Sequence, residues 1–131
     1  MERYKEVLIK VFQKYRRMQK IAANPIDPKV TQSFDTVVVQ GGLKENIVEK
    51  LVIKKADAEA YIYLIDQAIK QLSDTDERPY QRIIIYKYKN FYSAQRIAIM
   101  IGYSVQHYFV KLKEAQKELC EIIDLWGIDY N

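Results

Sequence analysis

The sequence contains a single cysteine, a single histidine and no long run of apolar residues. Cys120 alone forms neither an internal disulfide nor a Cys-x-x-Cys metal site, and its place in an apolar helical stripe predicts a buried structural thiol. Because His107 is the sole histidine, zinc sites and Ser/Cys-His nucleophile pairs lack the partners that they need. We therefore expect no catalytic residue, no metal and no cofactor.

The longest apolar runs, such as 83–85 and 98–101, are far shorter than a membrane-spanning helix. Charged residues interrupt the rest of the chain, so no secretory leader is expected either. These features predict a soluble intracellular protein that does not contact membranes.

Charge is distributed unevenly along the chain, whose net charge is +4. Residues 1–23 carry seven bases and two acids, and residues 77–119 carry eight bases and three acids. Residues 24–76 and the last twelve residues are each net acidic. Two basic blocks suit a face that binds a polyanion, if they lie near each other. Ordinary solvated helix surfaces explain the first block equally well.

Apolar periodicity predicts an all-α fold that begins with a long amphipathic helix over residues 1–23. The Asn24-Pro25 pair ends this helix. Residues 25–42 are predicted to form an extended loop, although Val37-Val38-Val39 also suits a short strand. A second long helix follows, from about residue 43 or 44 to 72. Two such helices suggest an antiparallel hairpin or an intermolecular coiled coil, so a homodimer is plausible.

Residues 73–77 are rich in side chains that cap helices, and Pro79 fits the first turn of a third helix that runs to about Lys89. The acids in this segment are more simply explained as caps than as an acid/base pair. The third helix is expected to bury four residues. These are Tyr80, Ile83, Ile84 and Tyr88.

The segment from residue 93 to 119 predicts a helix-turn-helix. Ser93 can cap a short helix that ends at Ile101, and Gly102 suits the left-handed conformation just beyond it. Ser104 can cap the next helix, which continues to about Trp126. Ala98, four residues before the turn glycine, is small enough for a close helix crossing. Ile97 and Ile101 fill the inner face of the first helix, and Tyr103 fills the turn.

The second helix of this motif has one inward and one outward face. Val105, Tyr108, Leu112, Ala115, Leu119, Ile122 and Trp126 form the expected inward stripe. A recognition helix reads bases with outward residues of its N-terminal half, so Gln106, His107 and Val110 are the candidates for base contacts. Phosphate contacts are expected from the remaining polar side chains. These are Gln95, Arg96, Ser104, Lys111, Lys113 and Lys117.

Two of these candidates have simpler interpretations. His107 can merely cap the first turn of its helix, and Lys117 can pair with Glu114 or Glu121 on the surface.

We predict a helical hairpin and possible oligomerisation region over 1–76, with its loop at 25–42. A DNA-binding domain follows over 77–131.

The stretch from Tyr86 to Leu119, with its Ile-Ala helix, Gly-Tyr-Ser turn and Glu-Ala near the end, resembles the C-terminal part of the ArpU and RinA groups of phage transcriptional regulators. Within it, residues 93–119 resemble region 4 of bacterial sigma factors. The match covers the last third of the chain, and the remainder agrees in outline only.

The resemblance implies a phage or prophage regulator of late packaging and lysis genes, acting on double-stranded promoter DNA with host RNA polymerase. It also implies a place in the host bacterial cytoplasm, associated with the nucleoid. This sequence departs from the pattern by placing Val105, Phe109 and Val110 where arginines are common, and Lys111 where leucine is usual. Fewer cations predict a shallower salt dependence.

Two alternatives keep the same fold. In one, the apolar residues of the recognition helix and the basic first helix bind a protein partner such as polymerase, without autonomous DNA binding. In the other, the chain is the small DNA-packaging subunit of a phage terminase, which also combines a helix-turn-helix with long helices. A ring oligomer would favour the terminase interpretation over a dimer.

Overall fold

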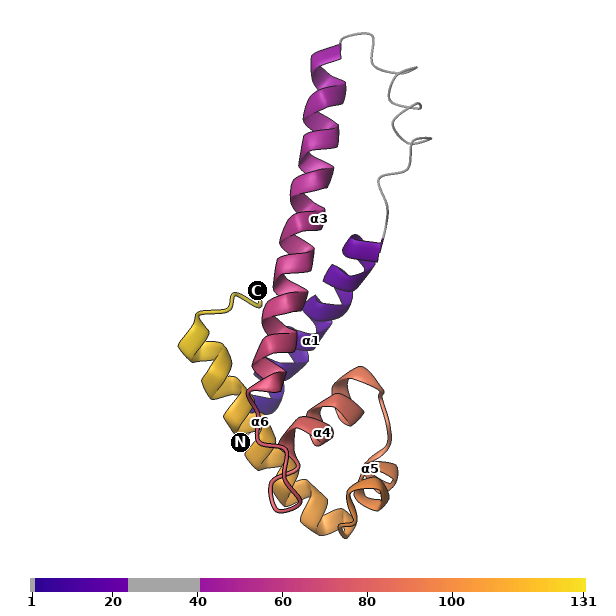
Figure 1. The fold of residues 1–131 in the computed structure, drawn as a ribbon, viewed down its shortest axis with the longest axis vertical. Helices are drawn as coiled ribbons and strands as arrows, with labels where there is room; N and C mark the ends of the chain where they lie inside the picture. The colour runs from indigo at the N-terminus through magenta and orange to yellow at the C-terminus, as the bar shows by residue number, and fades with distance from the viewer. Residues whose placement is uncertain (1, 24–40) are drawn as a thin grey trace. The chain divides into compact units, whose positions relative to one another are not determined.

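The computed structural model describes residues 2–23 and 41–131, and within these ranges the chain is all-α, as predicted, with no strand. Figure 1 shows the helices in chain order. They are α1 (Glu2–Ala23), α3 (Gly41–Lys70), α4 (Tyr80–Ile84), the π-helical turn η1 (Ile85–Lys89), α5 (Ala94–Ile101) and α6 (Val105–Trp126).

The expected loop over residues 25–42 lies outside the described residues, except for its last two glycines. Gly41 and Gly42 were assigned to the loop, but they form the first residues of α3. The second helix therefore begins two residues earlier than the apolar pattern predicted. Periodicity cannot locate such an end, because glycine contributes nothing to an apolar face.

The chain divides into two compact units. One consists of residues 1–14 and 64–131, and the other of residues 15–63. In the second unit Tyr15, Ala58 and Tyr61 are buried. The helix-turn-helix lies wholly in the first unit, whose packing is described below.

The inner face of α6 runs through the core of the first unit. Tyr108, Leu112, Ala115 and Leu119 are buried, as their spacing predicted. The two ends of the expected stripe were wrong, because Val105 and Trp126 are 37% and 40% exposed. Helical periodicity identifies a face, but tertiary packing decides how far a neighbouring helix covers it.

Beyond Leu119 the buried face of α6 changes its phase. Ile123 is completely buried, whereas Ile122 is only half-buried. Leu119 and Ile123 are both buried and lie four residues apart, so Trp126, three residues further on, is not at the centre of the buried face. Gly127, with φ 64°, then ends the helix, and Ile128 returns to the core with its N–H donating to the carbonyl of Ile123 at 3.1 Å.

Tyr88 of η1 contacts both α1, through an aromatic stack, and α6, through a buried hydrogen bond. The ring of Phe12 stacks on Tyr88, with centroids 4.6 Å apart and planes inclined by 8°. The side-chain amide of Gln116 donates to the Tyr88 hydroxyl oxygen at 2.9 Å. Burial raises the pKa of Tyr88, so the phenol stays neutral and accepts this bond. The contact satisfies Gln116, which is only 5% exposed.

The third helix buries all four predicted residues, but it is not α-helical throughout. From Ile85 to Lys89 it widens into a π-helical turn, and the N–H of Asn90 donates to the carbonyl of Ile85 at 3.1 Å. The side chain of Lys89 forms an ion pair of 2.7 Å with Asp66 at the end of α3. Phe91 follows with a positive φ of 58°.

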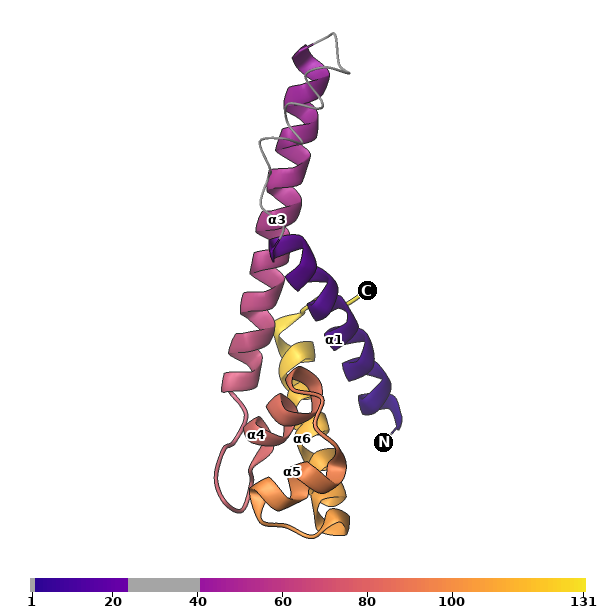
Figure 2. The same cartoon turned by 90° about the vertical axis from the view of Figure 1, so that its right-hand side faces the viewer.

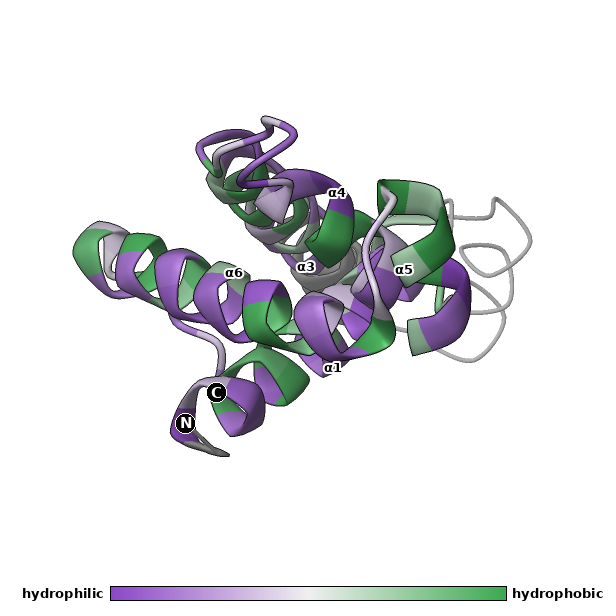
Figure 3. Cartoon of the chain, turned by 90° about the horizontal axis from the view of Figure 1, so that it is seen from below, coloured by the Kyte–Doolittle hydropathy of each residue, from purple (hydrophilic) through white to green (hydrophobic). Residues whose placement is uncertain are grey.

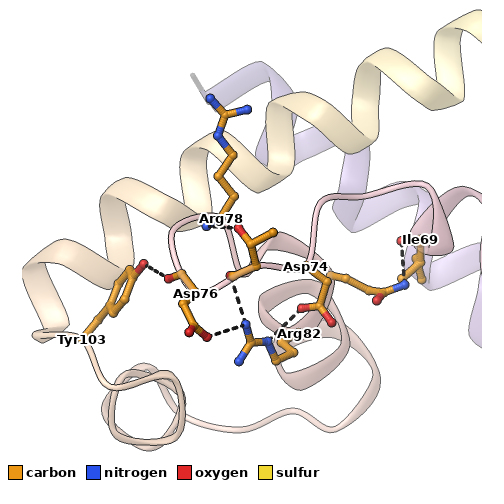
Figure 4. A network of polar contacts seen from close by, with 8 residues as sticks. Ile69, Asp74, Asp76, Arg78, Arg82 and Tyr103 are labelled. Carbon is orange, nitrogen blue, oxygen red and sulfur yellow. Dashed lines mark hydrogen bonds and ion pairs between the residues drawn. The ribbon is translucent and has the colours of Figure 1, made fainter.

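The predicted capping role of residues 73–77 was wrong. The N-cap position of α4 is Pro79, and no side chain caps this helix. The acid Asp74 pairs instead with the guanidinium of Arg82 at 2.8 Å, and Arg82 also donates to the carbonyl of Thr75 at 3.0 Å (Figure 4). Both contacts of Arg82 hold the loop before α4 against that helix, so Asp74 stabilises the loop rather than the helix start.

Cys120 is a buried thiol, as predicted, and it donates to the backbone carbonyl of Tyr4 in α1 at 3.6 Å. Burial, followed by the nearby Asp124, raises its pKa from 9.0 to about 12. The folded state therefore favours the protonated thiol. This preference contributes stability that is fully present below about pH 9 and is lost as pH rises toward 12.

We expect Cys120→Ala to flatten the alkaline decline in stability. Between about pH 8 and pH 10, the free energy of unfolding of the unmodified chain should fall by about 1 kcal/mol more than that of the variant. Urea unfolding at each pH, followed by circular dichroism, measures this difference. Parallel pH profiles for the two proteins would show that the thiol ionises equally in both states.

Candidate nucleic-acid interface

The helix-turn-helix forms at the predicted residues, and backbone capping fixes its turn. The Ser93 hydroxyl accepts the N–H of Arg96 at 3.2 Å, and the Ser104 hydroxyl accepts the N–H of His107 at 3.1 Å. Gly102 adopts φ 75°, so the chain leaves α5 in the left-handed conformation. Each of these three capping roles is confirmed.

Two backbone hydrogen bonds cap the C-terminal end of α5. The N–H of Tyr103 donates to the carbonyl of Ala98 at 2.9 Å, while the N–H of Gly102 reaches Ile99 at 3.2 Å. This six-to-one and five-to-two pattern is a Schellman motif. Figures 1 and 2 show α5 and α6 joined by this short turn, with α4 packed beside them.

The inner residues of the motif lie largely where the spacing placed them. Ile97 and Ala98 are buried, and Ile101 is half-buried. Tyr103 is also half-buried, and its hydroxyl donates to the backbone carbonyl of Asp76 (Figure 4). The turn is therefore tied to the loop before α4, a contact that no local sequence pattern indicated.

Four of the proposed DNA-contacting side chains share one exposed strip of α6. They recur at three- and four-residue steps, which places them within a narrow arc of the helix surface. All four are exposed, and Val110 is 52% exposed. The members of this strip, called the outward strip below, are Gln106, Val110, Lys113 and Lys117.

His107 lies beside the outward strip, and it takes part in the cap that the sequence offered as the alternative to a base contact. Its backbone N–H completes the cap at Ser104, while its exposed ring stacks on Tyr103 with centroids 4.6 Å apart. This stacking restrains the imidazole next to Gln106. The i to i+4 spacing of the two aromatic rings was the available sequence signal.

Lys111 differs from the other lysines of α6, because it is drawn into a polar cluster with Glu114. Its ammonium lies 3.6 Å from the Glu114 carboxylate, and its side chain is only 19% exposed. The Glu114 carboxylate also accepts a hydrogen bond from the hydroxyl of Tyr80. Burial and this bond raise the pKa of Tyr80 to about 12. Glu114 therefore balances the charge of Lys111, and a phosphate there would meet a carboxylate.

The remaining candidates stand near the start of a helix. Gln95, Arg96 and Ser104 are exposed. The Arg96 guanidinium carbon lies 3.9 Å from the centroid of the Tyr92 ring, a cation–π contact that leaves its N–H groups at the surface. Ser104 accepts the capping bond through its oxygen and retains its own hydroxyl hydrogen for donation.

Exposed apolar side chains accompany the polar ones on both helices. On α5, Ile99 is 80% and Met100 46% exposed, and on α6, Phe109 is 45% exposed. Figure 3 shows the hydrophobic colour over much of α5 and alternating colours along α6. Isolated exposed apolar residues are ordinary, but several on one small motif mark a surface suited to a partner.

Comparison of the chain with protein-family models, with curated proteins and with solved structures yields no match. Among the described residues, no three histidine, cysteine, aspartate or glutamate side chains gather as a metal site would require. In residues 2–23 and 41–131, no helix has both the length and the hydrophobicity needed to cross a bilayer. The candidate interface therefore stands on its own geometry.

We expect Gly102→Ala to destabilise the helix-turn-helix through backbone conformation alone. A Cβ at this position meets no atom within 4 Å, so the cost is that of the left-handed conformation, about 1–2 kcal/mol. Gly102→Asn should cost less, since asparagine tolerates this region better. Thermal unfolding of both variants measures the difference. A Gly102→Ala protein as stable as the original would show that the turn accepts another conformation.

Proposed function

We propose that this chain is a sequence-specific DNA-binding regulator that places α6 in the major groove. The observation that carries the proposal is the doubly capped helix-turn-helix, which holds the outward strip of α6 free of intramolecular covering. A recognition helix of this kind presents side chains of its first turns to base edges. The net positive charge of residues 77–119 supports a polyanionic partner.

Within this proposal, Gln106 and Val110 read bases. A glutamine amide can pair with adenine N6 and N7, and a valine methyl can contact the thymine methyl. His107, restrained by Tyr103, lies at the edge of the same contact region. Lys113 and Lys117 bind phosphates, together with Gln95, Arg96 and Ser104. Lys111 contributes less to phosphate binding than these residues, because it is paired with Glu114.

We further propose that the regulated genes are late genes of a phage or prophage. The support is the resemblance of residues 86–119 to the ArpU and RinA regulators, because the Gly-Tyr-Ser turn and its flanking helices occur here as capped elements. In that setting the protein acts at promoters in the host bacterial cytoplasm. Host RNA polymerase is the expected protein partner.

We expect Gln106→Ala to weaken binding to a preferred site by about tenfold, because one bidentate base contact contributes about 1–3 kcal/mol of discrimination. The preferred site is a duplex that the unmodified protein enriches from a random pool. Fluorescence anisotropy against that duplex and against a scrambled duplex measures the ratio of affinities. The scrambled duplex should be bound equally by variant and parent.

Two matched variants make this measurement specific. Gln19→Ala changes an exposed glutamine on α1 and should leave both affinities unchanged. Lys117→Ala should weaken both duplexes together and reduce the slope of log affinity against log salt by about one, since it removes one phosphate contact. Equal losses on both duplexes for Gln106→Ala would count against base reading.

The exposed apolar residues favour a second candidate function, in which the same surface binds a protein. Phe109 and Val110 on α6, with Ile99 on α5, are the residues that motivate it. Gel-shift titrations at about 50 and 200 mM salt separate the candidates, because phosphate-dependent binding changes strongly over that range. A shift at low salt that weakens at high salt supports DNA binding. The absence of a shift at either concentration favours the protein-binding alternative.

A further inference from the structure

The C-terminal half of α6 and Gln71, the residue that follows α3, border an open groove of about 370 Å³. Leu125 and Trp126 form its most exposed apolar part, at 83% and 40% exposure. These large side chains are accessible to water, whereas the neighbouring Ile123 is completely buried. The lining, called the acidic groove below, consists of Gln71, Glu118, Glu121, Ile122, Leu125 and Trp126.

The charge of this region specifies the chemistry of an occupant. From residue 118 to the last residue the sequence contains four acids and no lysine or arginine. Glu121 is exposed at the edge of the groove, whereas Glu118 is half-buried and lies 3.5 Å from the Ser73 hydroxyl, which donates to it. A groove that combines exposed apolar side chains with two carboxylates fits a basic amphipathic helix.

The chain itself contains a helix face of this kind. In the N-terminal half of α1, Lys5, Ile9 and Lys10 are exposed, and Ile9 is 40% exposed. Lys5 lies four residues before Ile9, so the two side chains are neighbours on the helix surface. These three residues, called the basic face below, place one apolar side chain between two cations, and the exposed Glu6 lies one turn before Lys10 on the same surface.

The basic face cannot enter the acidic groove of its own chain. The packing of Phe12 on Tyr88 and the contact of Cys120 with Tyr4 hold α1 in place. Cys120 and the centre of the groove lie on nearly opposite sides of α6 when its residues are projected around the helix. The basic face must therefore be supplied by another copy.

We propose that the acidic groove of one chain binds the basic face of a second copy of this chain. Ile9 packs against Leu125 and Trp126, and Lys10 lies opposite Glu121. If the basic face of each chain binds the acidic groove of the other, a twofold axis relates the two contacts and the assembly closes as a dimer. The surfaces involved are separate from the outward strip, so the inference goes beyond the proposed DNA contact.

The test is sedimentation equilibrium of the full chain without DNA, so that a failure of DNA binding does not affect the result. We expect a dimer at about 50 mM salt that dissociates toward monomer at about 500 mM, because salt screens the ion pairs. Glu121→Lys should weaken association by about tenfold or more. A protein that is monomeric up to about 100 µM at low salt would overturn the proposal.

Matched variants tie the result to these surfaces. Glu77→Lys makes the same charge change at an exposed acid outside the groove and should leave the dimer intact. Leu125→Ser, at the most exposed apolar residue, should weaken the dimer without unfolding the chain. Equal weakening by Glu77→Lys and Glu121→Lys would overturn the proposal, since net charge alone would then explain the effect.

A charge exchange gives the sharpest outcome. Lys10→Glu alone should also dissociate the dimer, because it places an acid against the acidic groove. A mixture of the Glu121→Lys and Lys10→Glu proteins should form a one-to-one heterodimer, in which one contact is native and the other has its charges reversed. If the mixture remains monomeric while the unmodified chain dimerises, the proposed pairing is wrong.

Discussion

Burial of the inner face of α6 is the constraint on which the arrangement of the first unit depends. The core contains the side chains of the inner face, and α4 and α5 pack against the helix that carries them. These side chains are Tyr108, Leu112, Ala115, Leu119 and Ile123. Opposite this face, the surface of α6 is left to water and to partners. Burial at Leu119 and Ile123 also determines which side of the C-terminal half becomes the acidic groove. One helix thereby carries two surfaces of different chemistry.

Polar contacts fix details that burial alone leaves open. The side-chain amide of Gln116 donates to the hydroxyl of Tyr88, and that buried bond orients η1 against α6. The Tyr103 hydroxyl ties the turn between α5 and α6 to the loop at Asp76, and stacking on Tyr103 restrains His107. The candidate interface is therefore supported by residues outside it, as a site that must hold side chains in position requires.

Not every lysine of α6 is equally available to an anionic partner. The carboxylate of Glu114, held by Tyr80, balances Lys111, whereas Lys113 and Lys117 remain exposed. Phe109 and Val110 add exposed apolar surface to the same helix. Such a helix gains less from counterion release than an arginine-rich one. In the proposed dimer a second copy of α6 is joined to the first. If both copies bind the same DNA, the second binding event is intramolecular, which increases the affinity of the dimer for that DNA.

Local chemistry determined the elements that the sequence predicted well. Ser93, Gly102 and Ser104 act on backbone groups within a few residues, so their roles follow from type and spacing. The middle of the α6 stripe follows from helical periodicity for the same reason. Only tertiary structure decided that Asp74 pairs with Arg82 and that the Tyr80 hydroxyl donates to Glu114. It also decided that Val105 and Trp126 remain exposed. These outcomes depend on groups that are distant in sequence, and no local pattern records which distant partner will be nearest in the folded chain.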